Sequence, residues 1–275
     1  MASNPLIQSV SNSMVKYAHS LTSARKIKES SDFLCEGFHL VEEAIVSQQK
    51  IRFIFSTSRI LKSKEGLRLF EQARREKIKW FLVTDQIVIY LSSTVTPQEI
   101  IAVVKKPEWQ WPLKPLSSIL GLYQIQDAGN LGTILRSSEA LGGQGVLLTS
   151  SSCDPFNSKV VRASMGSIFR VPIMSNGSWE SYHEWFVQNK LMTVALDAHA
   201  SKSLFQLKTD IPIAFWLGSE GSGLPEELMH KCQERVFIPM AKPVESLNIA
   251  VAASLALFFI NLQNGYTDFS KEILV

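Results

Sequence analysis

One stretch of sequence constrains the fold most strongly: VFIPMAKPVESLNIAVAASLALFFI, residues 236–260. Residues 236–238 predict a short buried strand, and Pro239 ends it because proline has no N–H to donate to a neighbouring strand. Residues 249–260 contain no charged side chain, so we expect a helix that is buried on every side. This span is too short to cross a bilayer, which needs about 20 apolar residues. We therefore expect a core helix and not a membrane anchor.

A polar loop separates these two apolar elements. Ser246 stands where a helix N-cap is expected, because its hydroxyl could accept a hydrogen bond from a free backbone N–H. Glu245 and Asn248 would be drawn to the edge of a buried core, where unpaired polar groups are costly. This loop alone fits a capped surface loop as well as a functional site, and other segments must decide between them.

Composition bounds the class of protein. The chain has 275 residues, of which 45% are hydrophobic and 19% charged, as is ordinary for a globular protein, and the length suggests two domains. The three cysteines (Cys35, Cys153 and Cys232) lie far apart, which favours a reducing compartment over a disulfide framework or a zinc site. The N-terminus lacks a charged start followed by an apolar run, so no secretory signal is expected and the predicted location is cytoplasmic.

Positive charge is concentrated in the first part of the chain. Residues 1–105 carry 15 Lys+Arg and 10 Asp+Glu, a balance of +5, whereas the remainder has a balance of −2. A basic half predicts a polyanionic partner, although a solvated lysine-rich surface is the alternative. The candidate contacts with this polyanion are Lys16, Arg25, Lys26 and Lys28 in this half and Lys159 and Arg162 further on.

Strands alternate with helices in both parts of the chain. Residues 1–105 predict a small α/β domain with a largely parallel sheet, whose expected strands are 33–35, 51–57, 78–84 and 100–104. Residues 106–116 contain three prolines and predict an extended linker. Residues 117–150 predict a strand to about Gln126, a glycine-bearing turn, a helix and a second strand. The domain boundaries we expect are therefore 1–105, 106–116 and 117–275.

Two glycine-bearing turns follow predicted strands of the second domain, at the strand ends where open α/β sheets bind ligands. The first carries Asp127, Gly129 and Asn130, and its spacing fits neither a dinucleotide fingerprint nor a phosphate loop. The second, GSEGSG at 218–223, surrounds Glu220 with glycines that allow close approach of the backbone, and it does not fit a serine hydrolase motif. No pattern of zinc ligands occurs, so we expect no metal.

Taken in order, three segments resemble the SpoU (TrmH-type) family of RNA 2′-O-methyltransferases in the SPOUT superfamily. They are DAGNLGTILR, LGSEGSGLPEEL and IPMAKPVESLNIAVA. The resemblance covers about 117–262, and the run from Asn12 to Gly37 resembles the substrate-binding domain often fused to this family. The chain departs from the family pattern at Ala128 and Lys242, and neither belongs to the polar set of these segments.

The resemblance implies an α/β domain with a SPOUT-type parallel sheet, a C-terminal trefoil knot and a homodimer formed through this domain. It implies S-adenosylmethionine bound by backbone groups near Gly218, Ile238 and Leu247, with structured RNA as the substrate. Arg136 is the residue implied to act on the ribose 2′-hydroxyl. The residues implied to position the reactants are Asn130, Glu220, Ser246 and Asn248.

Two other interpretations remain open on the sequence. A non-catalytic RNA- or ribosome-binding protein could keep the same fold, although the retained polar set is unexpected in such a protein. A small-molecule nucleotide-binding enzyme is disfavoured, since the phosphate and dinucleotide fingerprints are absent. Ribosomal RNA is favoured over tRNA as the substrate by analogy with the family.

Overall fold

The computed structural model describes residues 6–109, 117–208 and 210–263. The chain forms two compact units, the first made of residues 1–108 and 154–170 and the second of residues 109–153 and 171–275. Most of the predicted linker, residues 110–116, lies outside the described residues. None of the helices in the described ranges combines the length and the apolar character that a membrane crossing requires.

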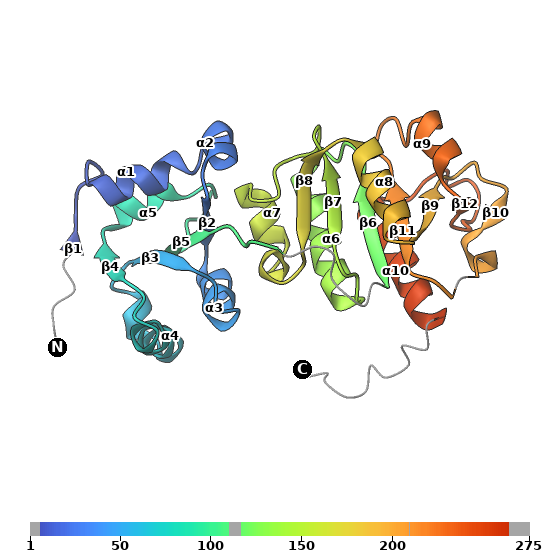
Figure 1. Cartoon of the computed structure of the whole chain (residues 1–275). Helices are drawn as coiled ribbons and strands as arrows, with labels where there is room; N and C mark the ends of the chain where they lie inside the picture. The colour runs from blue at the N-terminus through green and yellow to red at the C-terminus, as the bar shows by residue number, and fades with distance from the viewer. Residues whose placement is uncertain (1–5, 110–116, 209, 264–275) are drawn as a thin grey trace. The chain divides into compact units, whose positions relative to one another are not determined.

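The first unit contains five strands and several short helices (Figure 1). Its elements are β1 (Leu6–Ile7), α1 (Ser13–Ser20), α2 (Ala24–Glu29), β2 (Asp32–Glu36), α3 (Phe38–Val46), β3 (Ile51–Ser56), η1 (Ile60–Lys62), α4 (Lys64–Arg75), β4 (Trp80–Val83), α5 (Asp85–Leu91), β5 (Ile100–Lys105), α7 (Ser158–Ala163) and η2 (Ser167–Phe169). The four strands predicted from sequence are β2 to β5, each shifted by a residue or two at one or both ends.

The sheet of this unit is mixed, so the prediction of a largely parallel sheet was wrong. Its strand order is β1-β4-β3-β5-β2, and β4 runs parallel to both of its neighbours. β5 lies between β3 and β2 and runs antiparallel to both. Helices on the connections favour parallel pairing, but insertion of the last strand between two earlier ones reverses half of the pairs.

The segment that follows β7 packs in this first unit. The Phe156 ring lies 4.9 Å from the ring of Phe33 on β2, and the Phe169 ring lies 6.2 Å from it. Lys106 Nζ stands over the Phe156 ring at 4.9 Å from its centroid. Phe33 is fully buried. Residues 154–170 therefore complete the core of a unit whose other residues come from the start of the chain.

The second unit is built on a seven-stranded sheet in which every neighbouring pair is parallel (Figure 1). Its elements are β6 (Ser118–Leu122), α6 (Ala128–Ala140), β7 (Val146–Thr149), β8 (Ile173–Gly177), α8 (Trp179–Gln188), β9 (Met192–Leu196), β10 (Lys202–Ser203), η3 (Leu204–Gln206), β11 (Ile213–Leu217), α9 (Glu226–Lys231), β12 (Glu234–Phe237) and α10 (Ile249–Gln263). The strand order is β10-β12-β9-β11-β6-β7-β8. This confirms the predicted fold class, an α/β protein with a parallel sheet.

The central strands are buried along their whole length, as parallel strands with helices on both faces must be. Every residue of β6, β7 and β11 is buried. A Cβ added at Gly121 on β6 would lie 2.6 Å from the Trp216 ring, so only glycine lets this large side chain cross the neighbouring strand. Trp216 belongs to the core shared with Phe186 of α8, whereas α10 packs with α6.

The predicted apolar helix is α10, but it is not buried on every side. Ala253, Ala256 and Leu257 lie on its buried face. The opposite face carries a stripe of apolar side chains that are between 39% and 48% exposed, namely Val251, Leu255, Phe258 and Leu262. Their spacing places these four side chains on one side of the helix. The helix is therefore uncharged because one face packs in the core and the opposite face is apolar but exposed in the single chain.

Candidate active site

Three loops of the second unit leave the sheet at the same edge. β6 and β11 are neighbours, and β9 separates β11 from β12. These strands are parallel, so the loops that follow β6, β11 and β12 all begin at the carboxyl edge. This is the edge at which open α/β sheets bind ligands.

The first loop places Asn130 in the first turn of α6. β6 ends at Leu122 and not near Gln126 as predicted, because the chain turns at Gln124, where φ is +54°. Asp127 is the N-cap of α6, and its Oδ1 accepts a hydrogen bond from the Asn130 backbone N–H at 2.8 Å. This cap holds the Asn130 backbone in place and leaves its side chain free to reach the other loops.

The Asn130 side chain joins all three loops. Its Nδ2 donates to Glu220 Oε1, in the loop after β11, at 2.9 Å. Its Oδ1 accepts from Asn248 Nδ2, in the loop after β12, at 2.9 Å. Glu220 and Asn248 lie 90 and 118 positions from Asn130 in the sequence. The structure therefore brings three of the predicted site residues into one hydrogen-bonded chain, while their role in catalysis stays a prediction.

Asn248, and not Ser246, caps the helix that follows, so the predicted cap was wrong. α10 begins at Ile249, and Asn248 Oδ1 accepts a hydrogen bond from the Ala250 N–H at 2.9 Å. Both residue types are good caps, but the helix starts two residues later than the sequence suggested. Asn248 thus uses its oxygen for the helix and its amide for Asn130, while Ser246 is exposed.

Arg136 lies on α6, beyond Asn130, and its side chain is exposed. Its position six residues after Asn130 keeps it within two turns of the loop edge. The exposed guanidinium is accessible to a substrate, and the structure leaves its predicted catalytic role untested.

The residues expected to hold a cofactor through their backbone lie in the same loops. A Cβ at Gly218 would meet the Gly223 carbonyl carbon at 2.1 Å, so this glycine is needed for the loop to fold back on itself. A Cβ at Gly221 would have no atom within 4 Å. Ile238 directly follows β12, and Leu247 is half-buried just before α10. Open space therefore lies beside Gly221, and Ile238 and Leu247 flank the irregular loop 239–247.

The sequence analysis missed a further carboxylate at this edge. Asp197 follows β9, and its Oδ2 accepts from Arg235 Nη2 at 2.9 Å. Burial alone would raise the pKa of Asp197, but hydrogen bonds from Arg235 and from the His199 backbone N–H outweigh burial and lower it. The position directly after a central strand is the signal that could have identified it.

The predicted RNA contacts all belong to the first unit. Lys16 and Lys28 are exposed, and Arg25 and Lys26 are exposed and form ion pairs with Glu29. Lys159 and Arg162 belong to α7 in the first unit, where Lys159 is exposed and Arg162 half-buried.

Comparison with known proteins adds a family and a set of relatives. Residues 117–258 match the SpoU rRNA Methylase family, and residues 12–102 match the MRM3-like substrate binding domain. A relative from Synechocystis, an uncharacterized tRNA/rRNA methyltransferase, is 31% identical over 92% of this chain and 92% of its own length. RlmP of Bacillus subtilis, a 23S rRNA (guanosine(2553)-2′-O)-methyltransferase, is 29% identical over 92% of this chain and 98% of its own length.

Solved structures resemble most of the chain, across both units. The SpoU methyltransferase AviRb from Streptomyces viridochromogenes, in complex with AdoMet, has a TM-score of 0.82 and 25% identity, covering 92% of this chain and 98% of its own. An AdoMet-bound rRNA methyltransferase from Sinorhizobium meliloti has a TM-score of 0.81 and 25% identity, covering 94% of this chain and 97% of its own.

Proposed function

Because the chain belongs to the SpoU rRNA Methylase family, we propose that it transfers a methyl group from S-adenosylmethionine to a ribose 2′-hydroxyl of ribosomal RNA. The observation that carries this proposal is the hydrogen-bonded chain Glu220–Asn130–Asn248. It ties together the three loops by which the sequence resembles the family. A site for group transfer needs such preorganisation, since small errors in position are costly in rate.

The loops fit S-adenosylmethionine bound through backbone groups. Among the described residues, the loop 239–247 forms a single backbone–backbone hydrogen bond, from Val244 N–H to Ala241 O at 3.2 Å. Its other backbone donors and acceptors are thus available, and the space beside Gly221 is open. Gly218, Ile238 and Leu247 are the residues that would hold the cofactor. When bound, S-adenosylmethionine supplies an electrophilic methyl group on a sulfonium sulfur.

Arg136 is the residue we assign to the ribose hydroxyl. Arginine is a poor base because its guanidinium stays protonated in proteins. Its guanidinium can instead orient the hydroxyl and stabilise the negative charge that develops on the oxygen. Glu220, Asn130 and Asn248 would hold the loops around it, and Ser246, exposed beside Asn248, would contact substrate or cofactor directly.

The first unit is proposed to bind the RNA. It matches a substrate-binding domain and carries the excess of positive charge. The residues proposed to contact RNA are Lys16, Arg25, Lys26, Lys28, Lys159 and Arg162. Ribosomal RNA is preferred over tRNA because both RlmP and the Streptomyces viridochromogenes relative are named as 23S rRNA 2′-O-methyltransferases.

We further propose a homodimer in which the exposed stripe of α10 meets a second copy of the chain. A contiguous apolar face on a helix is unusual on a monomer surface and typical of an interface. The trefoil knot, a cytoplasmic location and the boundaries at 105 and 117 also remain proposals. They are tested by chain tracing in a crystal structure, by cell fractionation and by limited proteolysis.

The experiment that tests the function is nucleoside mass spectrometry after incubation of purified protein with S-adenosylmethionine and a 23S rRNA transcript. We expect one 2′-O-methylated nucleoside, formed at least about a hundredfold more slowly by Arg136→Ala. RNA binding without methylation, in protein that also binds S-adenosylmethionine, would favour the non-catalytic alternative. Methylation of tRNA but not of rRNA would overturn the choice of substrate.

A further inference from the structure

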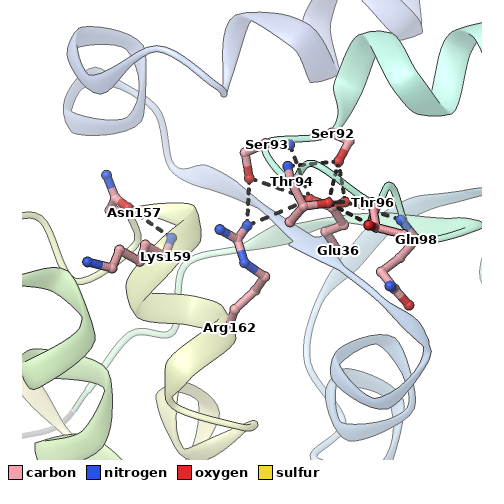
Figure 2. A network of polar contacts seen from close by, with 9 residues as sticks. All are labelled: Glu36, Ser92, Ser93, Thr94, Thr96, Gln98, Asn157, Lys159 and Arg162. Atoms are coloured by element: carbon pink, nitrogen blue, oxygen red, sulfur yellow. Dashed lines mark hydrogen bonds and ion pairs between the residues drawn. The ribbon is translucent and has the colours of Figure 1, made fainter.

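A buried carboxylate in the first unit organises a loop and an arginine (Figure 2). Glu36, the last residue of β2, is 6% exposed. Its oxygens accept hydrogen bonds from the Ser92 hydroxyl, from the Thr94 hydroxyl at 3.0 Å and from the backbone N–H groups of Ser93 and Gln98 at 3.3 and 3.4 Å. The loop 92–98 therefore satisfies this carboxylate by itself.

Arg162 of α7 lies next to this carboxylate but donates no hydrogen bond to it. Its Nη1 lies 3.7 Å from Glu36 Oε2, beyond hydrogen-bond reach, and donates to Ser93 Oγ at 2.6 Å. A guanidinium carries five N–H donors, and this is the hydrogen bond that Arg162 donates to residues in the described part of the chain. Its side chain is 30% exposed. Donors of Arg162 are thus left for a ligand, in an orientation fixed by Ser93 and Glu36.

Arg162 and Glu36 also line a pocket. The pocket has apolar walls that include Leu21, Leu34 and Phe156, and Ser93 lines it as well. Figure 2 shows the Lys159 side chain extending away from the Arg162 guanidinium, so Arg162 is the cation of this site. A planar fork of donors suits a tetrahedral oxyanion such as a phosphate.

We propose that Arg162 binds one backbone phosphate of the RNA substrate and that Glu36 and Ser93 are positioning residues that hold its guanidinium in place beside the pocket. This rests on the proposed function, since it takes RNA as the substrate. The carboxylate lowers the net charge of the site, so its contribution is geometric: a fixed guanidinium loses less side-chain entropy when it binds.

The salt dependence of RNA binding tests the phosphate contact. Each phosphate that a cation neutralises adds about 0.7–0.9 to the slope of log affinity against log salt. Arg162→Gln should lower this slope by about that amount for a 23S rRNA transcript and weaken binding about tenfold at low salt. Arg52→Gln is the matched control, because Arg52 also pairs with a buried carboxylate, Asp32, at 3.1 Å, but does not line the pocket. A wild-type slope for Arg162→Gln would overturn the proposal.

The positioning role is tested by the sign of a second effect. If Glu36 acted only through its charge, Glu36→Gln would strengthen RNA binding; if it positions Arg162, binding should weaken severalfold. Ser93→Ala gives an independent measurement, because it removes the Arg162 hydrogen bond and the long Ser93 Oγ contact to Glu36 Oε2 at 3.5 Å, and leaves the Ser92, Thr94 and backbone donors to Glu36 in place. Stronger binding by Glu36→Gln, or unchanged binding by Ser93→Ala in folded protein, would refute positioning.

Failure of this site and failure of the proposed function give different results. If the function holds and the site holds, Arg162→Gln raises the KM for RNA by more than it lowers kcat. Suppose wild-type protein methylates RNA, and Arg162→Gln changes neither the KM for RNA nor the salt slope of binding. This result would refute the phosphate site and support the proposed function. If Arg162→Gln reduces the salt slope of RNA binding but wild-type protein never methylates RNA, the proposed function is refuted and the phosphate site is supported.

Discussion

Replacing Asn130 by aspartate should convert its hydrogen bond with Glu220 into a repulsion between two carboxylates. The variant loses the donor to Glu220 Oε1, but its carboxylate can still accept from Asn248 Nδ2. A hydrogen bond to a charged group contributes about 1.5–3 kcal/mol, and we take the lower value because this pair is exposed. Two unit charges about 4 Å apart repel by about 1 kcal/mol in water and about 4 at an effective dielectric of 20. With the value in water for this exposed pair, the total is about 2.5 kcal/mol, which corresponds to a loss of roughly 70-fold in single-turnover methyl transfer.

A second substitution should restore the bond with donor and acceptor exchanged. In Asn130→Asp with Glu220→Gln, the new amide can donate to the new carboxylate, and the carboxylate still accepts from Asn248. We expect the double variant to recover most of the lost rate, and the Asn130→Asp defect to diminish in high salt. Asn176→Asp, at an exposed position on β8, controls for added charge. A double variant no faster than Asn130→Asp alone would show that this pair is not coupled, and the reasoning would fail.

Four further outcomes are expected. Arg136→Ala should bind S-adenosylmethionine nearly normally, measured by calorimetry, but transfer methyl groups at least about a hundredfold more slowly; near wild-type single-turnover rates would make Arg136 structural. Gly218→Ala should weaken cofactor binding, because its Cβ would overlap the backbone of its own loop, whereas Gly221→Ala, with open space, should not; equal effects would contradict this account of the loop. Phe258→Asp should dissociate the dimer in sedimentation, and an unchanged mass would move the interface elsewhere. Burial is the main cause that lowers the pKa of His183, so the folded state keeps it neutral and stability should fall as pH drops below about 6.5; urea unfolding should show this dependence reduced in His183→Phe, and an undiminished dependence would assign it to other groups.

The parallel sheet and the convergence of its loops could be expected from sequence because both depend on local patterns. Uninterrupted apolar strands followed by glycine-bearing turns indicate parallel pairing and place the turns at one edge. Strand direction in the first unit could not be inferred in this way. β5 pairs antiparallel with β2 and β3 because of where it inserts, and its own residues do not encode that position.

The errors at α10 and its cap have a common physical origin. An apolar residue facing the core and one facing a partner are alike in sequence, so the exposed stripe could not be separated from the buried face. Ser246 and Asn248 both have side chains that cap helices, and the choice between them depends on where the backbone turns. Glu36 was not singled out because its donors lie 56–62 residues away in a loop without a motif.

The packing of residues 154–170 in the first unit also sets an order of events during synthesis. Phe33 is buried partly by Phe156 and Phe169, which leave the ribosome well after residue 108. At about 5–20 residues per second, the early unit waits roughly 3–12 seconds for the piece that completes it. Meanwhile β6, α6 and β7 of the other unit emerge between the two halves of its core. Folding of the first unit is therefore finished only after the first strands of the second unit's sheet exist, and a nascent chain stalled before residue 170 should remain sensitive to protease at its amino-terminal end.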